Sequence, residues 1–98
     1  MSSSKDYKDY VLEQLSLLDG ISVRPMMGEF LLYLNGLLFG GIYDDNLLVK
    51  RVENNKKYEM QEVIPYPGAK TMYLVDNVDN PELLKDIVLD TCSGLSRK

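Results

Sequence analysis

The stretch Arg24–Arg51 constrains the fold more than any other part of the chain. Within it, two apolar segments, Phe30–Leu34 and Leu37–Tyr43, flank the dipeptide Asn35-Gly36. Asn-Gly suits a two-residue type I′ turn, because both central residues of that turn need positive φ. Strands joined by so short a turn must run antiparallel. The pair Gly40-Gly41 inside the second strand indicates a bulge or a close approach of backbones.

Further strands are expected on both sides of this hairpin. Apolar and polar residues alternate over Ile21–Met27, and Pro25 places that strand at an edge or at a bulge because proline cannot donate a ladder hydrogen bond. The run Asp44-Asp45-Asn46 predicts a second turn, which leads into a strand over Leu47–Arg51. A fifth strand is expected over Thr71–Val75. The leucines of the central strands come in adjacent pairs, so we expect both faces of these strands to be at least partly covered.

An amphipathic helix is predicted near the N-terminus. Apolar residues recur at helical spacing over Lys5–Leu18, and Ser3 or Ser4 can cap the start of the helix. Gly20 is placed to end it in a left-handed conformation.

The second half of the chain predicts two helical segments separated by a loop. The polar segment Glu53–Gln61 is expected to form a short helix with Tyr58 facing inward, and Pro65–Lys70 a loop. A second long helix begins after Asn80, because Asn is a favoured N-cap and proline follows it at the first helical position. Gly94 is expected to end this helix.

These elements together predict one two-layer α+β domain over residues 1–98, an antiparallel sheet of about five strands with N- and C-terminal helices packed on it. A hydrophobic fraction of 45% and a charged fraction of 27% fit a globular domain of this length. The N-terminus has no signal-peptide pattern, and no apolar run reaches the ~20 residues that span a bilayer. We therefore expect a cytoplasmic protein with no membrane association.

The composition offers little catalytic or metal-binding chemistry. The chain has no histidine and a single cysteine, Cys92. It therefore lacks the commonest general base near neutral pH and the commonest zinc ligand. We interpret Cys92 as a structural thiol and Asp44-Asp45 as a solvated turn, because two adjacent carboxylates supply too few ligands for calcium. We predict no catalytic residue, no metal site and no cofactor.

The charge balance disfavours direct binding of nucleic acid. The formal net charge is −4, whereas nucleic-acid affinity depends largely on basic side chains that neutralise phosphates. Lys50, Arg51, Lys56 and Lys57 form the only basic cluster, and glutamates are interspersed with it. We interpret this cluster mainly as a solvated surface, with nucleic-acid binding as an unfavoured alternative.

An ordered set of residues resembles the TfoX/Sxy N-terminal domain family. The set comprises Arg24, Met26-Met27-Gly28, Tyr33, Asn35-Gly36, Phe39, the strand Leu47–Lys50, Pro65-Tyr66 and Met72-Tyr73. The resemblance covers roughly residues 7–94 and implies a fold related to secretion-chaperone-like α+β domains. It also implies a link to the regulation of competence genes in bacteria, in which founding members act as transcriptional co-activators. Those regulators carry a second, helical domain, so the resemblance is to a stand-alone N-terminal domain.

Two functions follow as expectations. The first is a non-enzymatic protein-interaction module that regulates competence or transcription through a protein partner, with homodimerisation as a secondary prediction. The second is a small-ligand-binding protein or minor enzyme, in which Arg24, Lys50, Lys70 and tyrosines hold an anion beside the loop Pro65–Lys70. Because Met26 and Met27 lie on alternate faces of a strand, we expect one to be buried and one available. The candidate interaction surface comprises Arg24, Met26, Met27, Gly28, Tyr66 and Lys70.

Overall fold

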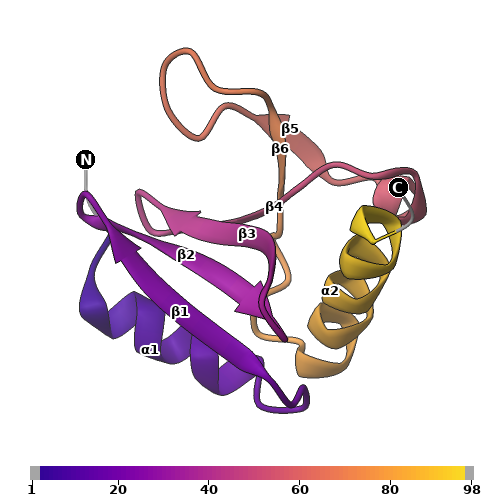
Figure 1. Cartoon of the computed structure of the whole chain (residues 1–98), viewed down its shortest axis with the longest axis horizontal. Helices are drawn as coiled ribbons and strands as arrows, with labels where there is room; N and C mark the ends of the chain where they lie inside the picture. Colours follow the sequence, from indigo (N-terminus) through magenta and orange to yellow (C-terminus); the bar gives the residue numbers. More distant parts are fainter. Residues whose placement is uncertain (1–2, 97–98) are drawn as a thin grey trace.

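The computed structural model describes residues 3–96 as one α+β fold (Figure 1). The elements follow in the order α1 (Lys5–Gln14), β1 (Ile21–Met26), β2 (Glu29–Leu34), β3 (Leu37–Tyr43), β4 (Asn46–Val49), the 3₁₀ helix η1 (Glu53–Tyr58), β5 (Gln61–Val63), β6 (Met72–Leu74) and α2 (Pro81–Leu95). The six strands form one antiparallel sheet in the order β1-β2-β3-β4-β6-β5. The predicted fold class is confirmed, with six strands where about five were expected.

Three two-residue turns connect the first four strands. Asn35 and Gly36 have φ values of 51° and 85°, as the predicted turn requires. Met27-Gly28 and Asp44-Asp45 also have positive φ at both positions. The first four strands are therefore a meander whose neighbours in sequence are neighbours in the sheet, and Pro25 lies in the edge strand β1 as expected.

The pair Gly40-Gly41 marks both a bulge and a close approach. The register between β2 and β3 shifts at Leu32/Tyr33. A Cβ atom on Gly40 would lie 2.2 Å from the carbonyl oxygen of Leu48 in the adjacent strand. Only glycine fits there without a shift of the backbone, which confirms the interpretation of this pair.

Helix α1 starts as predicted but ends earlier. The Ser4 hydroxyl accepts a hydrogen bond from the Tyr7 N–H at 3.1 Å, so Ser4 is the N-cap. The expected end at Leu18 was wrong, because regular α-helix stops at Gln14 and the chain continues in turns, with the Leu18 N–H bonded to the Leu15 carbonyl. This tighter path leaves Leu15 buried in the core.

The turn after β3 also has a structural role. The Asp45 carboxylate accepts a hydrogen bond from the Ser4 N–H at 2.8 Å, and the Asp45 N–H donates to the Ser3 hydroxyl. The Ser3 hydroxyl in turn donates to the Glu29 carboxylate. The turn predicted to be merely solvated therefore ties the start of α1 to the sheet.

Helix α2 begins as expected and ends one residue later than expected. The Asn80 side chain accepts a hydrogen bond from the Leu83 N–H, and Pro81 follows in the first turn. The predicted stop at Gly94 was wrong, because the helix runs to Leu95. A Cβ atom on Gly94 would lie 2.7 Å from the Val52 Cβ, so this glycine permits close packing instead of ending the helix.

The segment between β4 and β6 differs most from the expectation. The predicted helix over Glu53–Gln61 is a 3₁₀ helix that stops at Tyr58, and Glu59 follows with φ of 54°. Strand β5 was not predicted, since two of its three residues are polar and exposed at the sheet edge. Tyr58 is half-buried and its hydroxyl donates a 2.5 Å hydrogen bond to Asp90 on α2.

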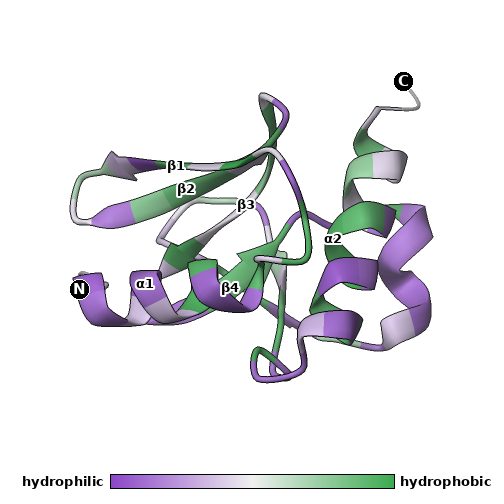
Figure 2. Ribbon diagram, turned by 90° about the horizontal axis from the view of Figure 1, so that it is seen from below, coloured by the Kyte–Doolittle hydropathy of each residue, from purple (hydrophilic) through white to green (hydrophobic). Residues whose placement is uncertain are grey.

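Both helices cover the same face of the sheet and share one core with it. Figure 2 shows apolar residues on the side of α2 that faces the strands. The fully buried side chains are contributed by α1, the strands and α2, and the largest are Phe39, Leu15, Leu32, Ile42, Leu47, Leu48 and Leu84. Neither helix within residues 3–96 is long and apolar enough to cross a membrane.

Candidate functional site

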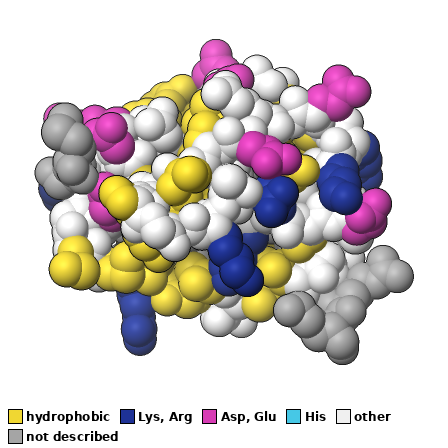
Figure 3. Space-filling model, turned by 90° about the horizontal axis from the view of Figure 1, so that it is seen from above, with side chains coloured by type: hydrophobic (Ala, Val, Ile, Leu, Met, Phe, Trp, Pro, Cys, Tyr) yellow, Lys and Arg dark blue, Asp and Glu magenta, His cyan; other side chains and the backbone are white. Residues whose placement is uncertain are grey.

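The sheet has a second face, opposite the helices, which we call the open face. Side chains alternate along a strand, so residues next to the core positions Leu32 and Leu47 point to this other side. The register pairs Arg24 with Leu31 and Tyr33 with Leu38 across neighbouring strands. Figure 3 shows apolar side chains over much of the side seen from above, with Lys and Arg side chains among them.

A hollow of about 690 Å³ lies on the open face under the loop between β5 and β6. We call it the basic hollow. Residues from the sheet, from this loop and from the end of α2 line it: Met26, Leu31, Leu38, Gly40, Tyr43, Lys50, Arg51, Pro65, Tyr66, Ala69, Lys70, Thr71, Met72 and Leu95. The hollow thus combines apolar side chains from β1, β2, β3, β6 and α2 with polar groups from the end of β4 and from the loop.

The charged side chains that line the basic hollow are all basic. Its lining includes Lys50, Arg51 and Lys70 and no carboxylate. Arg51 lies 3.5 Å from the exposed carboxylate of Glu62. Within residues 3–96, neither Lys50 nor Lys70 forms an ion pair. Two ammonium groups are therefore available to an anionic group of a ligand.

Aromatic contacts fix the loop above the hollow. The rings of Tyr43 and Tyr66 lie 6.2 Å apart at 48°, within the range of favourable aromatic pairs. Burial raises the pKa of Tyr43, and the neighbouring Tyr66 adds to this effect. The Tyr66 side chain is still half exposed, so one ring both supports the loop and remains open to a ligand.

Three of the six candidate surface residues meet in this hollow. Met26, Tyr66 and Lys70 come from distant parts of the sequence and all line it. Arg24 lies on the same face, outside the hollow, with its guanidinium 6.0 Å from the ring centroid of Tyr33.

The remaining candidates, Met27 and Gly28, form the tip of the β1–β2 turn and do not line the hollow. Met27 is 96% exposed, as expected for one member of the pair, whereas Met26 is half-buried where a buried side chain was expected. The strand ends at Met26, so Met27 lies in the turn and not on the opposite face of the strand. With φ of 52°, Met27 occupies a left-handed conformation that non-glycine residues seldom adopt.

The basic cluster of the sequence is divided in space. Lys56 pairs with Glu53 at 3.1 Å and Lys57 with Asp90 at 3.1 Å, while Lys50 and Arg51 belong to the basic hollow. The sequence did not single out the apolar part of the hollow, contributed by Leu31, Leu38, Met72 and Leu95. The adjacent leucine pairs were the signal that could have found it, since one member of each pair had to face away from the core.

A buried amide positions the end of β4 beneath this site. Asn55 on η1 is fully buried, and its NH₂ group donates to the Lys50 carbonyl at 2.9 Å and to the Thr91 hydroxyl at 2.8 Å. Its side-chain oxygen accepts from the Val52 N–H at 3.2 Å. Asn55 therefore links the backbone of Lys50–Val52 to α2 and fixes the position from which the side chains of Lys50 and Arg51 extend.

Cys92 lies away from the hollow, in the core on α2. Its side chain is buried, and burial raises the pKa of the thiol. A raised pKa disfavours the reactive thiolate, which supports the structural interpretation.

The comparisons with known proteins give one distant relative. The chain is 26% identical over 98 residues to an uncharacterized 12.7 kDa protein in the trpE 5′ region of Spirochaeta aurantia, a match that covers 97% of this chain and 85% of the relative. No family model matches the chain. No solved structure matches it either.

Proposed function

We propose that this chain is a non-enzymatic interaction module that binds a protein partner on its open face, through an acidic segment carrying apolar side chains. The basic hollow carries the proposal, because its lining combines apolar side chains with three cationic groups and no carboxylate, and only Arg51 of these cations pairs with a carboxylate within residues 3–96. An acidic segment would pair with the ammonium groups while its apolar side chains cover Leu31, Leu38 and Met72. Clustered basic groups commonly recognise acidic motifs in this way.

The charge of the whole chain strengthens the selectivity of this arrangement. The net charge of −4 repels acidic partners from most of the surface, so the local basic area directs them to one place. Direct nucleic-acid binding is less favoured, because three of the four clustered cations, Arg51, Lys56 and Lys57, already pair with carboxylates of this chain.

The resemblance to the TfoX/Sxy N-terminal domain supports a narrower version of the proposal. In this version the partner is part of the bacterial transcription or competence machinery, and the chain regulates it by binding. Reduced transcript levels of competence genes in a deletion strain, restored by the wild-type chain, would support this version; unchanged transcripts would contradict it.

The direct test measures binding of a labelled peptide by fluorescence anisotropy. The probe is a twelve-residue peptide alternating Glu with Leu and Phe, compared with the same peptide carrying Lys at each Glu position. We expect saturable binding of the acidic probe and none of the basic probe. The double variant Lys50→Gln/Lys70→Gln should weaken binding about tenfold, if each exposed charge contact is worth about 0.7 kcal/mol.

A matched control keeps the same change in net charge. Lys5→Gln/Lys56→Gln removes two exposed lysines that lie outside the basic hollow. This control should bind the acidic probe like the wild type after both are compared at equal ionic strength. Equal weakening by both double variants would show a general charge effect and would count against the proposal.

A small anionic ligand is the second candidate, because a volume of about 690 Å³ falls within the range of small-molecule sites. A thermal-shift series with anionic metabolites distinguishes the two. Stabilisation by a small anion that the Lys50→Gln/Lys70→Gln variant abolishes would favour this candidate. No shift with any anion, together with peptide binding, would favour the protein partner.

Homodimerisation stays a secondary prediction. Both sheet edges are poor templates for strand addition, since β1 contains Pro25 and β5 has three residues. We therefore expect any dimer to form through the open face. Light scattering at high concentration should show twice the monomer mass for the wild type and a monomer for a Leu31→Lys variant; a monomeric wild type would exclude the dimer.

A further inference from the structure

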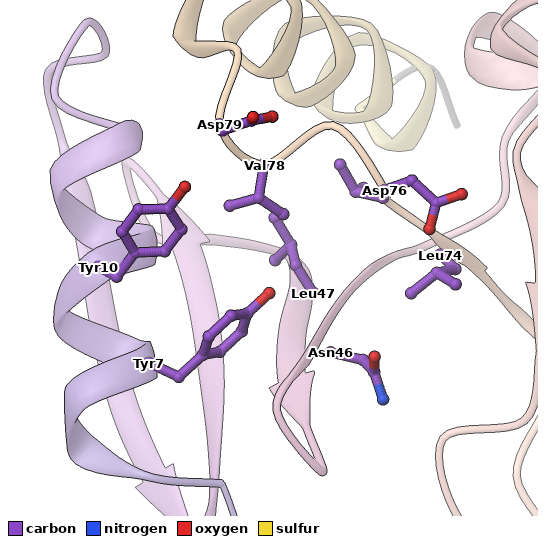
Figure 4. A pocket seen from close by; sticks show the side chains of 9 residues that line it. Tyr7, Tyr10, Asn46, Leu47, Leu74, Asp76, Val78 and Asp79 are labelled. Carbon is purple, nitrogen blue, oxygen red and sulfur yellow. The ribbon is translucent and has the colours of Figure 1, made fainter.

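A second hollow, of about 320 Å³, lies between α1 and the segment that connects β6 to α2 (Figure 4). We call it the tyrosine groove. Tyr7 and Tyr10 extend into it from α1, and Asp76 and Asp79 come from the β6–α2 segment across from them. Leu47 of β4 lies at its base. The groove shares no lining residue with the basic hollow.

The chemistry of the tyrosine groove is the reverse of that of the basic hollow. Its lining contains two carboxylates and no lysine or arginine. Burial raises the pKa of Tyr7, and the neighbouring Tyr10 and Asp45 add to this effect. Within residues 3–96, neither Asp76 nor Asp79 forms an ion pair. The groove therefore presents uncompensated negative charge.

The two aromatic rings add a second kind of attraction for cations. The ring centroids of Tyr7 and Tyr10 lie 6.2 Å apart with a 39° angle between the planes. Cationic groups are attracted to the faces of such rings, and most strongly where they are partly desolvated. No side-chain hydrogen bond from either hydroxyl is formed within the described chain, so both can accept one from a bound cation.

We propose that the tyrosine groove binds an organic cation, a guanidinium or primary ammonium group on a short alkyl stem. The cationic group would lie beside the tyrosine rings, with negative charge supplied by the exposed carboxylates of Asp76 and Asp79. The volume is near the lower limit for ligand sites and suits one such group. The same chemistry is present in free diamines and in arginine or lysine side chains of a peptide.

The test is an NMR titration of the full chain, with agmatine as the probe. N-Butylurea serves as a neutral analogue of similar shape. We expect saturable shifts of backbone amides at residues 7–10, 46–47 and 74–79 with agmatine and much smaller shifts with N-butylurea. Equal shifts with both compounds, or shifts confined to other residues, would overturn the proposal.

Matched variants separate the groove from general charge effects. Asp76→Asn/Asp79→Asn should weaken agmatine binding about tenfold, since both carboxylates lose their charge with little change in shape. Glu13→Gln/Asp86→Asn makes the same charge change at exposed positions outside the groove and should leave binding unchanged. Equal weakening by the two double variants would contradict a specific site, and dispersed spectra would establish that each variant is folded.

A tripeptide Gly-Arg-Gly distinguishes the two sources of the cation. Tighter binding of the tripeptide than of agmatine would assign the groove to a basic segment of a protein, and the reverse would assign it to a free amine. Both outcomes support an organic-cation site. Failure of both compounds to bind at millimolar concentration would refute it.

Discussion

Replacing Asn55 by alanine should destabilise the fold by about 3 kcal/mol, more than most substitutions of a polar residue in a short helix. The side chain is fully buried and makes three hydrogen bonds, to Val52 N–H, to the Lys50 carbonyl and to the Thr91 hydroxyl. Alanine removes all three and leaves these partners with no replacement from the protein.

The magnitude follows from the hydrogen bonds and from the space left behind. A typical intramolecular hydrogen bond contributes about 1 kcal/mol net, and a buried group left without a partner costs at least as much. The three removed heavy atoms leave a small void that costs roughly 1 kcal/mol more. The alanine variant no longer has to bury a polar amide, and this gain offsets part of the loss. The expected net destabilisation is therefore about 3 kcal/mol.

The assay is urea unfolding followed by circular dichroism, with the free energy extrapolated linearly to water. The control is Asn54→Ala, which changes the neighbouring asparagine of η1. Asn54 makes no side-chain hydrogen bond within the described residues, so its replacement should cost less than about 0.5 kcal/mol. Thr91→Val removes the other partner and should cost about 1.5 kcal/mol, since the hydroxyl also donates to the Ile87 carbonyl at 2.7 Å.

The double variant Asn55→Ala/Thr91→Val isolates the bond between η1 and α2. We expect the sum of the losses in unfolding free energy of the two single variants to exceed the loss of the double variant by about 1 kcal/mol. This difference is the energy of the shared hydrogen bond. Strict additivity would refute the reasoning, because the two side chains would then act independently. A cost below about 1 kcal/mol for Asn55→Ala would refute it as well, since water would have replaced the lost partners.

Three further predictions concern single side chains. Gly40→Ala should lower stability in urea unfolding by about 3 kcal/mol, because its Cβ would lie 2.2 Å from the Leu48 carbonyl oxygen; a cost below about 1 kcal/mol would show that the bulge adapts. Met27→Asn should raise the unfolding free energy by about 0.5–1 kcal/mol, since asparagine tolerates the φ of 52° better, and a decrease would contradict this. The hydrogen bond from Tyr58 and, to a lesser extent, the nearby Lys57 hold the pKa of Asp90 below its usual 3.8; the stability this provides is complete above that value and is lost as pH falls through the lowered pKa. Tyr58→Phe should therefore flatten the acid limb of a stability–pH profile, and an unchanged limb would refute the role of this bond.

The local turn chemistry made the first half of the fold predictable from sequence. Asn35-Gly36 between two apolar segments strongly favours a type I′ turn, and Gly40-Gly41 marks a close approach that the structure contains. The end of a helix is harder to predict from local signals. Gly20 and Gly94 were both interpreted as helix ends. At Gly94, however, glycine is needed because a side chain there would collide with Val52, which is close in space but far away in the sequence.

The candidate site was predictable only in part, because it too depends on contacts between residues that are distant in the sequence. Met26, Tyr66 and Lys70 stand in separate segments, and it is the position of the β5–β6 loop over the sheet that brings them together. Asn55 was hidden in a polar segment, because its buried role depends on Thr91, thirty-six positions later. Side-chain partners at such separations leave no pattern within a short window of sequence.

The alternation of side chains along β4 separates the two proposed sites physically. Leu47 faces the tyrosine groove, whereas Lys50, after the end of the strand, lines the basic hollow. Because the two linings share no residue, charge changes in one should leave the other intact. Lys50→Gln/Lys70→Gln should therefore bind agmatine like the wild type, and Asp76→Asn/Asp79→Asn should bind the acidic peptide like the wild type. Loss of both activities in either variant would mean that the two sites depend on a shared conformation of β4 instead of on their own charges.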